Sequence, residues 1–512
     1  MMKLRKSSHV LFFFILMPVL GIGLFSGPPP RAAALRIGIN SFPASLNPVY
    51  ATTETSQAII NKVFKGLFYF DWKGRIREEL VEKVLLSDTK NHLEIIIELK
   101  KNIFFPGGKE LDAEDVVQTV KLLQNKNFKY PYISNLQFIR TIEKIDPYRF
   151  KITLAYQMAS WKNYLTFKIL NAREIKKVSP ETFRDMKLSG TGPYKIKTIK
   201  KPAKIVLELN DSPTVSRSIS TSGPGKMSRF IEYIVISHTH LAPLKLITNE
   251  IDICELQPEN VEAYKHTNTK AWHKKFSILK YKKFGYTYLV FNLRNSLITK
   301  NLRHFFYNFL VNGDFMARFL KDRGEPVISP FLLLNSKVKP MRLKTTPMET
   351  PVHLKILTNS ESKLRKELVL FLREELKPSG IVLQPVFLEY HSFLEYLKTG
   401  RYHIAVSGFI LDMDYDMTDI FSSGSYFNYA HFESPKMDAL LERGLRELNP
   451  RKREEIYLEG HRLWLEHLPL IPLFNLYYYV GVSRDIEIPG QTYEVVGSMG
   501  DFLFNIRQWT RK

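Results

Sequence analysis

Cysteine is nearly absent from this sequence of 512 residues, in which Cys254 is the only one. An intramolecular disulfide is therefore excluded, so the hydrophobic core alone must hold the fold together. Long low-complexity tracts are missing as well, while 44% of the residues are hydrophobic and 13% are aromatic. This composition indicates a packed globular protein, and the length predicts two or three lobes instead of a single core.

Complete catalytic signatures are also missing. GPGKMS at 223–228 resembles part of a phosphate-binding loop, but Ser220 and Met227 stand where that motif requires Gly and Ser or Thr. DMDYDMTD at 412–419 begins like a calcium loop, yet the later Gly and the bidentate Glu of that loop are replaced. We therefore expect neither an enzyme nor a cofactor or metal site.

Acidic residues are outnumbered by basic ones, with 51 Asp and Glu against 74 Lys and Arg and a net charge of +23. Such a balance suits nucleic acid, an anionic membrane surface or acidic ligands. The basic residues are scattered, however, and the densest runs, KIKTIKKPAK at 195–204 and KYKK at 280–283, carry no nucleic-acid-binding motif. We expect a generally basic, solvated surface and no nucleic-acid partner; a basic surface-binding protein is the least favoured alternative.

One long apolar run occurs, VLFFFILMPVLGIGLF at 10–25, and it follows a basic start. This order is typical of a secretory signal. Pro18 and two glycines weaken the run as a membrane-spanning helix. We predict a signal peptide over residues 1–34, cleaved between Ser26 and Leu35, with an uncleaved anchor as the alternative. The segment offers no cysteine for lipid attachment.

Strands and helices alternate after the first 34 residues, which predicts a mixed α/β fold. LRIGIN at 35–40 has the alternation of a half-buried strand, and a helix is expected over about Thr55 to Leu67. From Leu354 the order LKILTN, ESKLRKELVLFLREELKPSG, IVLQPVFLEY predicts a βαβ unit whose helix ends at Gly380. Further helices are expected at about 435–447 and 452–468.

The stretch NIFFPGGKELDAEDVV at 102–117 is the most detailed local signal. Its Pro-Gly-Gly predicts a turn after a strand. Asp112 and Asp115 then have the spacing of a capping box, and Leu111 and Val116 have the spacing of a hydrophobic staple. The stretch therefore predicts strand, turn and helix, which is a structural corner and not a binding site.

The same stretch resembles a segment of the extracytoplasmic solute-binding proteins of family 5, the oligopeptide- and dipeptide-binding components of ABC importers. Further segments resemble this family in the right order over about residues 35–485: SFPASLNP (41–48), VFKGLFYFDWKGRIREELVEK (63–83), GTGPYKI (190–196), LITNEIDI (246–253), YLVFNLRN (288–295), AHFESPKMDALLERG (430–444) and LPLIPLFNLYYY (468–479). The ordered set is specific, although each segment alone is weak. The segment after Asn210 departs from the family pattern, because a Ser-rich loop stands there.

The resemblance implies a periplasmic-binding-protein-like α/β fold with three lobes. Lobe I would be discontinuous, built from 35–70, 186–282 and 479–512; lobe II would be 71–185 and lobe III 283–478. Ligand would lie in a cleft between lobes I and III. Two crossings of the chain, near Lys282 and Tyr479, would act as hinges.

The resemblance also places the site residues. SGFILDMDYDMTDIF at 407–421 resembles the family segment at the edge of the cleft, and Asp412 falls at the position that receives a peptide's α-ammonium. The register is open by about two residues, so Asp414 and Asp416 are candidates too. Phe409 stands where a stacking Trp is common, and Tyr415 would supply further wall. An exposed acidic turn is the alternative reading of this segment.

From the resemblance we expect a monomeric, periplasmic protein that captures oligopeptides and delivers them to an inner-membrane ABC permease by hinge closure. The same scaffold also serves peptidoglycan fragments, nickel chelates, haem and sugars, so a non-peptide solute is the principal alternative.

Overall fold

The computed structural model describes most of the chain: residues 34–71, 75–89, 92–176, 178–211, 228–266, 270–311, 313–347, 350–411, 413–487, 495–496 and 510–511. The predicted signal peptide, apart from Ala34, lies outside these residues, and so do most of the Ser-rich loop and Asp412. Within the described part, no helix is long and apolar enough to cross a membrane.

The centre of the fold is a large mixed sheet with the strand order β16-β15-β17-β13-β18-β11-β1-β10-β9-β8, joined at its sides by β12, β14 and β20. Its strands are β1 (Ala34–Ile39), β8 (Tyr194–Lys200), β9 (Lys204–Leu209), β10 (Phe230–Val235), β11 (Ile253–Leu256), β12 (Phe276–Lys283), β13 (Gly285–Phe291), β14 (Gly324–Pro326), β15 (Val352–Asn359), β16 (Ile381–Leu388), β17 (Ile404–Ile410), β18 (Leu470–Ser483) and β20 (Val495–Val496). Parallel and antiparallel pairs both occur, so the fold is mixed α/β.

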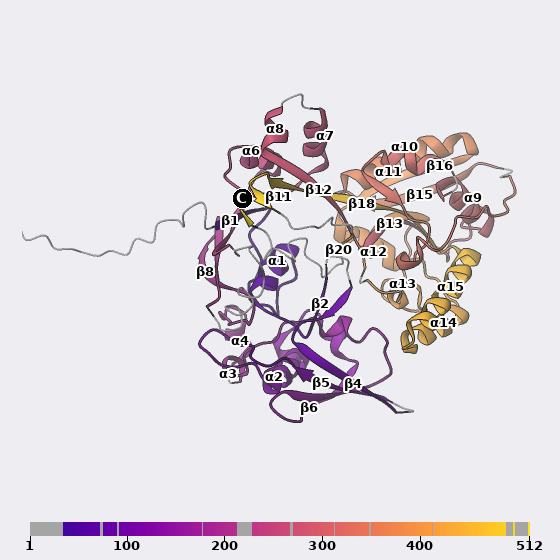
Figure 1. Ribbon diagram of the computed structural model, residues 1–512. Helices are drawn as coiled ribbons and strands as arrows, with labels where there is room; N and C mark the ends of the chain where they lie inside the picture. The colour runs from indigo at the N-terminus through magenta and orange to yellow at the C-terminus, as the bar shows by residue number, and fades with distance from the viewer. Residues whose placement is uncertain are drawn as a thin grey trace, which may run out of the picture.

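Three smaller groups of strands lie apart from this sheet. A four-stranded antiparallel sheet has the order β4-β5-β7-β6, and two-stranded sheets are formed by β2 with β3 and by β19 with β21. These strands are β2 (Phe68–Phe70), β3 (Ile76–Glu78), β4 (Val81–Thr89), β5 (His92–Leu99), β6 (Ile139–Lys144), β7 (Arg149–Leu154), β19 (Ile486–Glu487) and β21 (Thr510–Arg511). The four-stranded sheet forms the lower part of the molecule in Figure 1.

The helices cover the faces of these sheets. They are α1 (Glu54–Val63), α2 (Ala113–Gln124), α3 (Ala172–Ile175), α4 (Pro180–Phe183), α6 (Ala242–Ile247), α7 (Pro258–His266), α8 (Lys270–Lys275), α9 (Lys300–Val311), α10 (Phe315–Leu320), α11 (Lys363–Leu376), α12 (Tyr390–Thr399), α13 (Thr418–Phe421), α14 (Pro435–Arg446) and α15 (Pro450–His467). The predicted helix over Thr55 to Leu67 is shorter than expected, because the backbone is already extended at Phe64. The helices predicted near 435–447 and 452–468 are confirmed as α14 and α15.

The predicted βαβ unit is confirmed. β15 and β16 pair in parallel over their whole length, and α11 connects them. Gly380 ends the connection with φ of 76°, a left-handed conformation that a residue with a Cβ adopts at a cost.

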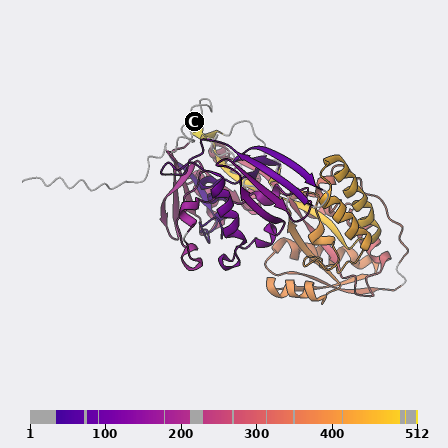
Figure 2. The ribbon, with the colours of Figure 1, turned by 90° about the horizontal axis from the view of Figure 1, so that it is seen from below.

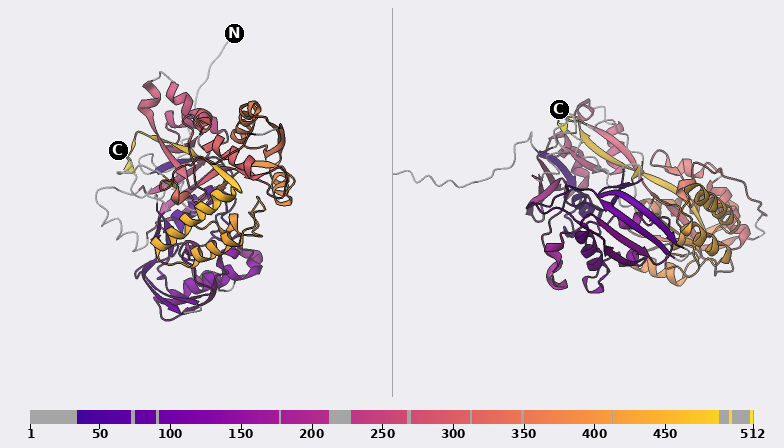
Figure 3. Two further views of the ribbon diagram at one scale, coloured as in Figure 1. Left: turned by 90° about the vertical axis from the view of Figure 1, so that its right-hand side faces the viewer. Right: turned by 60° about the horizontal axis from the view of Figure 1, so that its bottom comes forward.

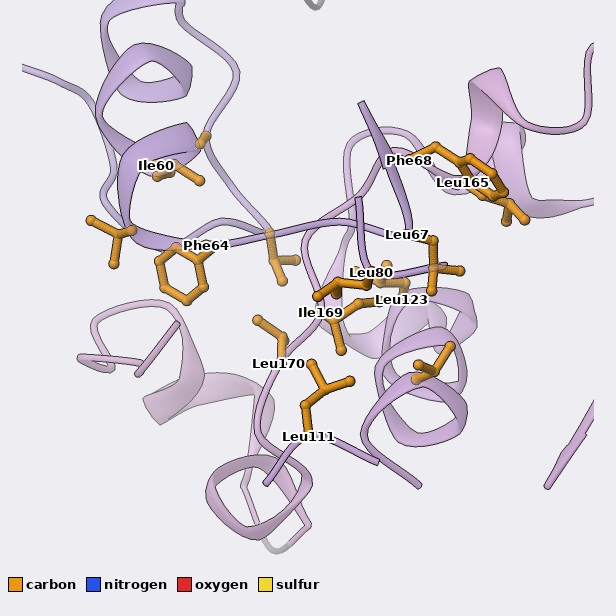
Figure 4. Packing of buried hydrophobic residues seen from close by; sticks show 14 of the residues in the cluster. Ile60, Phe64, Leu67, Phe68, Leu80, Leu111, Leu123, Leu165, Ile169 and Leu170 are labelled. Atoms are coloured by element: carbon orange, nitrogen blue, oxygen red, sulfur yellow. The ribbon is translucent and has the colours of Figure 1, made fainter. Parts of the chain in front are cut away.

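The strand, turn and helix of the stretch 102–117 are also confirmed. Asp112 accepts a hydrogen bond from the Asp115 N–H, and Asp115 accepts one from the Asp112 N–H, so the capping box is complete. Leu111 is fully buried, and Figure 4 shows it in one cluster with Leu170 and Leu123. The stretch is therefore a packed corner that joins α2 to the core.

Two large hydrophobic clusters divide the molecule into two bodies. The first cluster includes residues from β1, β5, β9 and α2, and the second is built from residues between Tyr286 and Phe474. We call residues 34–283 with 477–487 the amino-terminal body, and residues 285–476 the carboxy-terminal body. The carboxy-terminal body lies at the right of Figure 1 and is seen from two other sides in Figure 3.

Over the described residues, the chain crosses between the bodies at two adjacent places. β12 ends at Lys283 and β13 begins at Gly285, so Phe284 makes the first crossing. β18 makes the second, because it pairs with β14 up to Leu476 and with β12 from Tyr477. Figure 2 shows β18 running from one body into the other.

Candidate functional site

The predicted segment 407–421 begins on β17 in the carboxy-terminal body. Phe409 lies near the end of this strand and stacks on Tyr288 of the neighbouring β13, with ring centroids 4.2 Å apart and planes 14° from parallel. Tyr286 meets the same ring edge-on. Phe409 therefore belongs to an aromatic group at the strand ends, next to the crossing at Phe284.

Asp414 is held by Arg453 of α15 through two hydrogen bonds, of 2.8 Å from Nη1 and 2.5 Å from Nη2. Both side chains are nearly buried, with exposed fractions of 14% and 10%. Burial lowers the pKa of the Arg453 guanidinium, but the hydrogen bonds and charge of Asp414 outweigh burial and raise this pKa. The carboxylate of Asp414 thus already has a cationic partner within the same body.

Asp416 and Tyr415 are also engaged. Asp416 accepts hydrogen bonds from the N–H of Thr418 at 2.9 Å and from the hydroxyl of Thr418 at 2.5 Å, so it fixes the start of α13. Burial raises the pKa of the Asp416 carboxyl. The hydroxyl of Tyr415 donates to Glu454 at 2.9 Å. Of the predicted acids, Asp412 alone lies outside the described residues, so its role stays a prediction.

A cavity of about 280 Å³ opens beside Phe409, at the junction of the two bodies. We call it the strand-end cavity. Its walls come from β13, β17, β18 and the first turn of α11, and its lining residues are Lys283, Gly285, Tyr286, Thr287, Ser362, Leu364, Arg365, Gly408, Phe409, Ile410, Phe474, Asn475, Leu476 and Tyr478.

Arg365 supplies a positive charge to this cavity that the described residues leave without a carboxylate partner. Its recorded hydrogen bond runs from Nη1 to the amide oxygen of Asn359 at 3.0 Å, and burial lowers the pKa of its guanidinium. Arg365 also lies in the first turn of α11, where the helix dipole opposes a cation. A partly buried cation at this place is costly, and such groups concentrate at binding sites.

The backbone makes room for this guanidinium at Gly408. A Cβ on Gly408 would lie 2.5 Å from Nη2 of Arg365, closer than real contacts allow. The other cation of the cavity, Lys283, donates to both carboxylate oxygens of Glu54 at 2.7 Å and is therefore already neutralised. Arg365 is thus the cation of the cavity that remains available for an anionic group.

The hydroxyl of Tyr286 is a second uncompensated group. The side chain lines the cavity with an exposed fraction of 3%, and its hydroxyl has no hydrogen-bond partner among the described residues. A buried hydroxyl without a partner costs free energy that a bound polar ligand would recover.

An open strand edge borders the cavity. Leu411 donates its N–H to the carbonyl of Phe284 at 2.7 Å. Because alternate residues of an antiparallel pair direct their backbone groups to the same neighbour, Gly408 and Ile410 direct theirs away from β13. β15 pairs with β17 at Ile404 and Ala405, so no described strand covers the edge at Gly408 and Ile410. An extended chain could pair with this edge.

A second cavity of about 320 Å³ lies where the two bodies touch near α14. Met413 and Asp414 line it from one side, and Ser160 and Trp161 line it from the other. Next to it, Ala159 donates its N–H to the carbonyl of Leu445 at 2.7 Å. Met413 and Asp414, which belong to the carboxy-terminal body, therefore face the amino-terminal body across this cavity.

Arg365 and Tyr286 were not predicted from the sequence. One signal points to Arg365: Ser362 caps α11 and accepts a hydrogen bond from the N–H of Arg365, at the position where a capping box has Glu or Gln. A cation at that position contradicts local helix preference. No cluster of His, Cys, Asp and Glu able to hold a metal occurs in the described part of the chain.

Comparison with known proteins relates this architecture to solute-binding proteins. The chain is 23% identical to the oligopeptide-binding protein AppA of Bacillus subtilis (strain 168) over 94% of this chain and 92% of that protein. The structure of AppA from Bacillus subtilis in complex with a nonapeptide superimposes with a TM-score of 0.69 at 21% identity, covering 94% of this chain and 99% of that one.

Two other solved structures share the fold. NikZ from Campylobacter jejuni in complex with Ni(L-His) gives a TM-score of 0.72 at 22% identity over 94% of this chain and all of that one (100%). The substrate-binding protein CtaP from Listeria monocytogenes gives 0.78 at 20% identity over 93% of this chain and 99% of that one. The fold is therefore the mixed α/β fold of periplasmic binding proteins. Residues 76–308 match the family model described as bacterial extracellular solute-binding proteins, family 5 Middle, which relates the chain to this family of non-catalytic, solute-binding proteins.

Proposed function

We propose that this protein captures oligopeptides in the periplasm and delivers them, as a monomer, to an ABC import permease in the inner membrane. We also propose the three lobes expected from the sequence. The ligand would be held between the amino-terminal body and the carboxy-terminal body. The names of the similar proteins support a peptide ligand, since AppA of Bacillus subtilis is an oligopeptide-binding protein.

The observation that carries the proposal is the uncompensated guanidinium of Arg365 beside an open strand edge. A peptide offers what this arrangement lacks: a carboxylate for Arg365 and backbone groups for the edge at Gly408 and Ile410. The aromatic face of Phe409 and the hydroxyl of Tyr286 would border the same peptide. At the other end, Asp412 would receive the α-ammonium, because Asp414 and Asp416 have partners of their own.

Closure would bend the two crossings at Phe284 and Leu476. Because the crossings are adjacent and each body has its own hydrophobic cluster, the bodies can rotate without repacking either core. Ligand shifts this equilibrium only if it binds the closed form more tightly, which contacts to both bodies would provide.

A second candidate ligand is a small carboxylate-bearing solute, such as a metal chelate of an amino acid. The observation that favours it is the volume of the strand-end cavity. At about 280 Å³, this cavity is close to the lower end of the range of roughly 300–1,000 Å³ that is usual for small-molecule sites. NikZ from Campylobacter jejuni has the same fold and was solved with Ni(L-His). This ligand would use Arg365 in the same way but would need no strand pairing.

The test is a double-mutant cycle measured by calorimetry. Native mass spectrometry of the purified protein first identifies a co-purifying peptide, which is then synthesised with a free and with an amidated carboxyl terminus. Arg365→Gln and amidation should each weaken binding by about 2–5 kcal/mol, the usual cost of removing one partner of a buried charge pair. Because both changes remove one interaction, amidation should cost the variant much less than the wild type.

Arg373→Gln is the matched control, because Arg373 lies on the same helix but is exposed and pairs with the neighbouring Glu374. It should leave binding unchanged. Additive losses from Arg365→Gln and amidation would show that the carboxylate binds elsewhere. Co-purification of an amino-acid chelate without peptide would replace the peptide with the second candidate.

A further inference from the structure

A much larger hollow, of about 740 Å³, lies on the amino-terminal body and contains no residue of the carboxy-terminal body among its lining. Five separate segments enclose it: the loop after β1, the end of α1 at Val63, the turn at Pro106, the connection from α4 to β8, and β8 with the residue that follows it. Its lining is Phe42, Pro43, Ala44, Ser45, Leu46, Asn47, Tyr50, Thr52, Val63, Pro106, Arg184, Asp185, Met186, Lys187, Leu188, Ser189, Gly190, Lys195, Ile196, Lys197, Ile199 and Lys201.

The floor of this hollow is apolar. Its side chains are partly buried and pack directly on the main hydrophobic cluster of the amino-terminal body: Phe42, Leu46, Met186, Leu188, Ile196 and Ile199. Apolar surface that continues from a core into an open hollow favours an apolar occupant, because covering it removes that surface from water.

The rim of the hollow is basic, and it includes three of the five lysines in the run KIKTIKKPAK that the sequence singles out. Lys195 and Lys197 are paired with Asp211 and Glu208, at 2.7 and 3.1 Å. Lys187 and Lys201 have no carboxylate within ion-pair distance among the described residues.

Arg184 adds a third positive charge to this rim, stacked 5.3 Å from the ring centre of Tyr50. Asp185 is the one acid among the lining residues. The rim therefore keeps an excess of positive charge at the mouth of an apolar hollow.

We propose that this hollow binds a monomeric amphipathic anion, an acyl chain that ends in a carboxylate. The chain would cover the apolar floor, and the carboxylate would face Lys187, Lys201 and Arg184 at the rim. The volume lies within the range of roughly 300–1,000 Å³ that ligand sites have. A recessed hollow enclosed by five segments suits a single molecule better than a flat bilayer surface. The site is separate from Arg365 and independent of the proposed peptide capture.

The test uses sodium laurate below its micelle-forming concentration, with dodecyltrimethylammonium as a probe of equal chain length and opposite charge. Calorimetry and native mass spectrometry should show laurate bound once per chain and weakened by added salt, because salt screens exposed charges. Dodecyltrimethylammonium should bind far more weakly. Arg365→Gln should leave laurate binding unchanged, which separates this site from the strand-end cavity.

The variant is Lys187→Ala with Lys201→Ala, and its matched control is Lys274→Ala with Lys275→Ala, an equal loss of charge at exposed positions of α8. The rim variant should weaken laurate binding between twofold and about thirtyfold, as expected for two solvent-exposed charge contacts. The control should not change it. Equal losses in both variants, equal affinity for both probes, or binding only to anionic vesicles and not to monomeric laurate would each overturn the proposal.

Discussion

Replacing Asp414 by Asn should destabilise the carboxy-terminal body instead of weakening ligand binding. The carboxylate of Asp414 accepts two hydrogen bonds from Arg453, whose Nε donates to the carbonyl of Gly444 at 2.8 Å. Asp414→Asn keeps the size of the side chain but leaves a nearly buried guanidinium without the carboxylate that it is hydrogen-bonded to. This pair also links the segment after β17 to α15, so its loss loosens both.

The magnitude follows from burial. Removing one partner of a buried pair costs about 3–5 kcal/mol, and the remaining amide oxygen of Asn keeps part of the hydrogen bonding, so we expect about 3 kcal/mol. For a folding unit of 150–250 residues, this corresponds to a fall of roughly 6–12 °C in the melting temperature. Urea unfolding followed by tryptophan fluorescence is the assay, with ligand affinity measured on the folded protein.

The control is Asp414→Leu combined with Arg453→Met, which removes both charges and should recover much of the lost stability, since an apolar pair can replace a buried ion pair. An Asp414→Asn protein with wild-type stability and strongly reduced peptide affinity would refute the reasoning. It would show that Asp414 meets the ligand, and that Arg453 is satisfied in another way.

Three further outcomes are expected. Gly408→Ala should displace the guanidinium of Arg365 and weaken peptide binding in calorimetry. The unfolding midpoint should stay nearly unchanged, because the added Cβ meets only the flexible end of the Arg365 side chain. A large loss of stability would contradict this. Burial lowers the pKa of His461 to about 4, so the fold is most stable above pH 6.5 and loses stability as the pH falls toward 4. The urea midpoint of His461→Gln should fall less than that of the wild type over this pH range. Midpoints that fall equally with pH in both proteins would contradict this. Asp112→Ala should cost about 1 kcal/mol of unfolding free energy as a lost helix cap, and Asp115→Ala should cost more because its carboxylate also accepts from Ala172.

Local sequence signals predicted the local structure well. The capping box at Asp112 and the βαβ unit ending at Gly380 depend on residues a few positions apart, so composition and spacing alone specify them. The helix after Thr55 was predicted too long because Leu67 continues the apolar pattern of Ile59 and Val63. Phe64 instead has an extended backbone, and both Phe64 and Leu67 are buried in the main cluster, a tertiary effect that periodicity cannot reveal.

The residues of the proposed binding site could not be predicted in the same way. Arg365 and Gly408 are far apart in sequence and come together because α11 starts beside the end of β17. The sequence favoured Asp412 and kept Asp414 and Asp416 as alternatives within an open register, and the structure gives Asp414 and Asp416 separate structural partners. A charge pattern shows which residues can bind a ligand, but only packing shows which of them already have a partner.

This distribution of partners also argues for the chemistry of the ligand. Of the two cations in the strand-end cavity, Lys283 is neutralised by Glu54, and Arg365 is not neutralised by any described carboxylate. A ligand that enters this cavity must therefore bring a negative group, or the guanidinium remains desolvated without a countercharge. A neutral sugar would leave this cost unrecovered, whereas a peptide carboxylate or an amino-acid chelate recovers it. We therefore propose carboxylate-bearing solutes over neutral ones, because only a negative group offsets the desolvation cost of the Arg365 guanidinium.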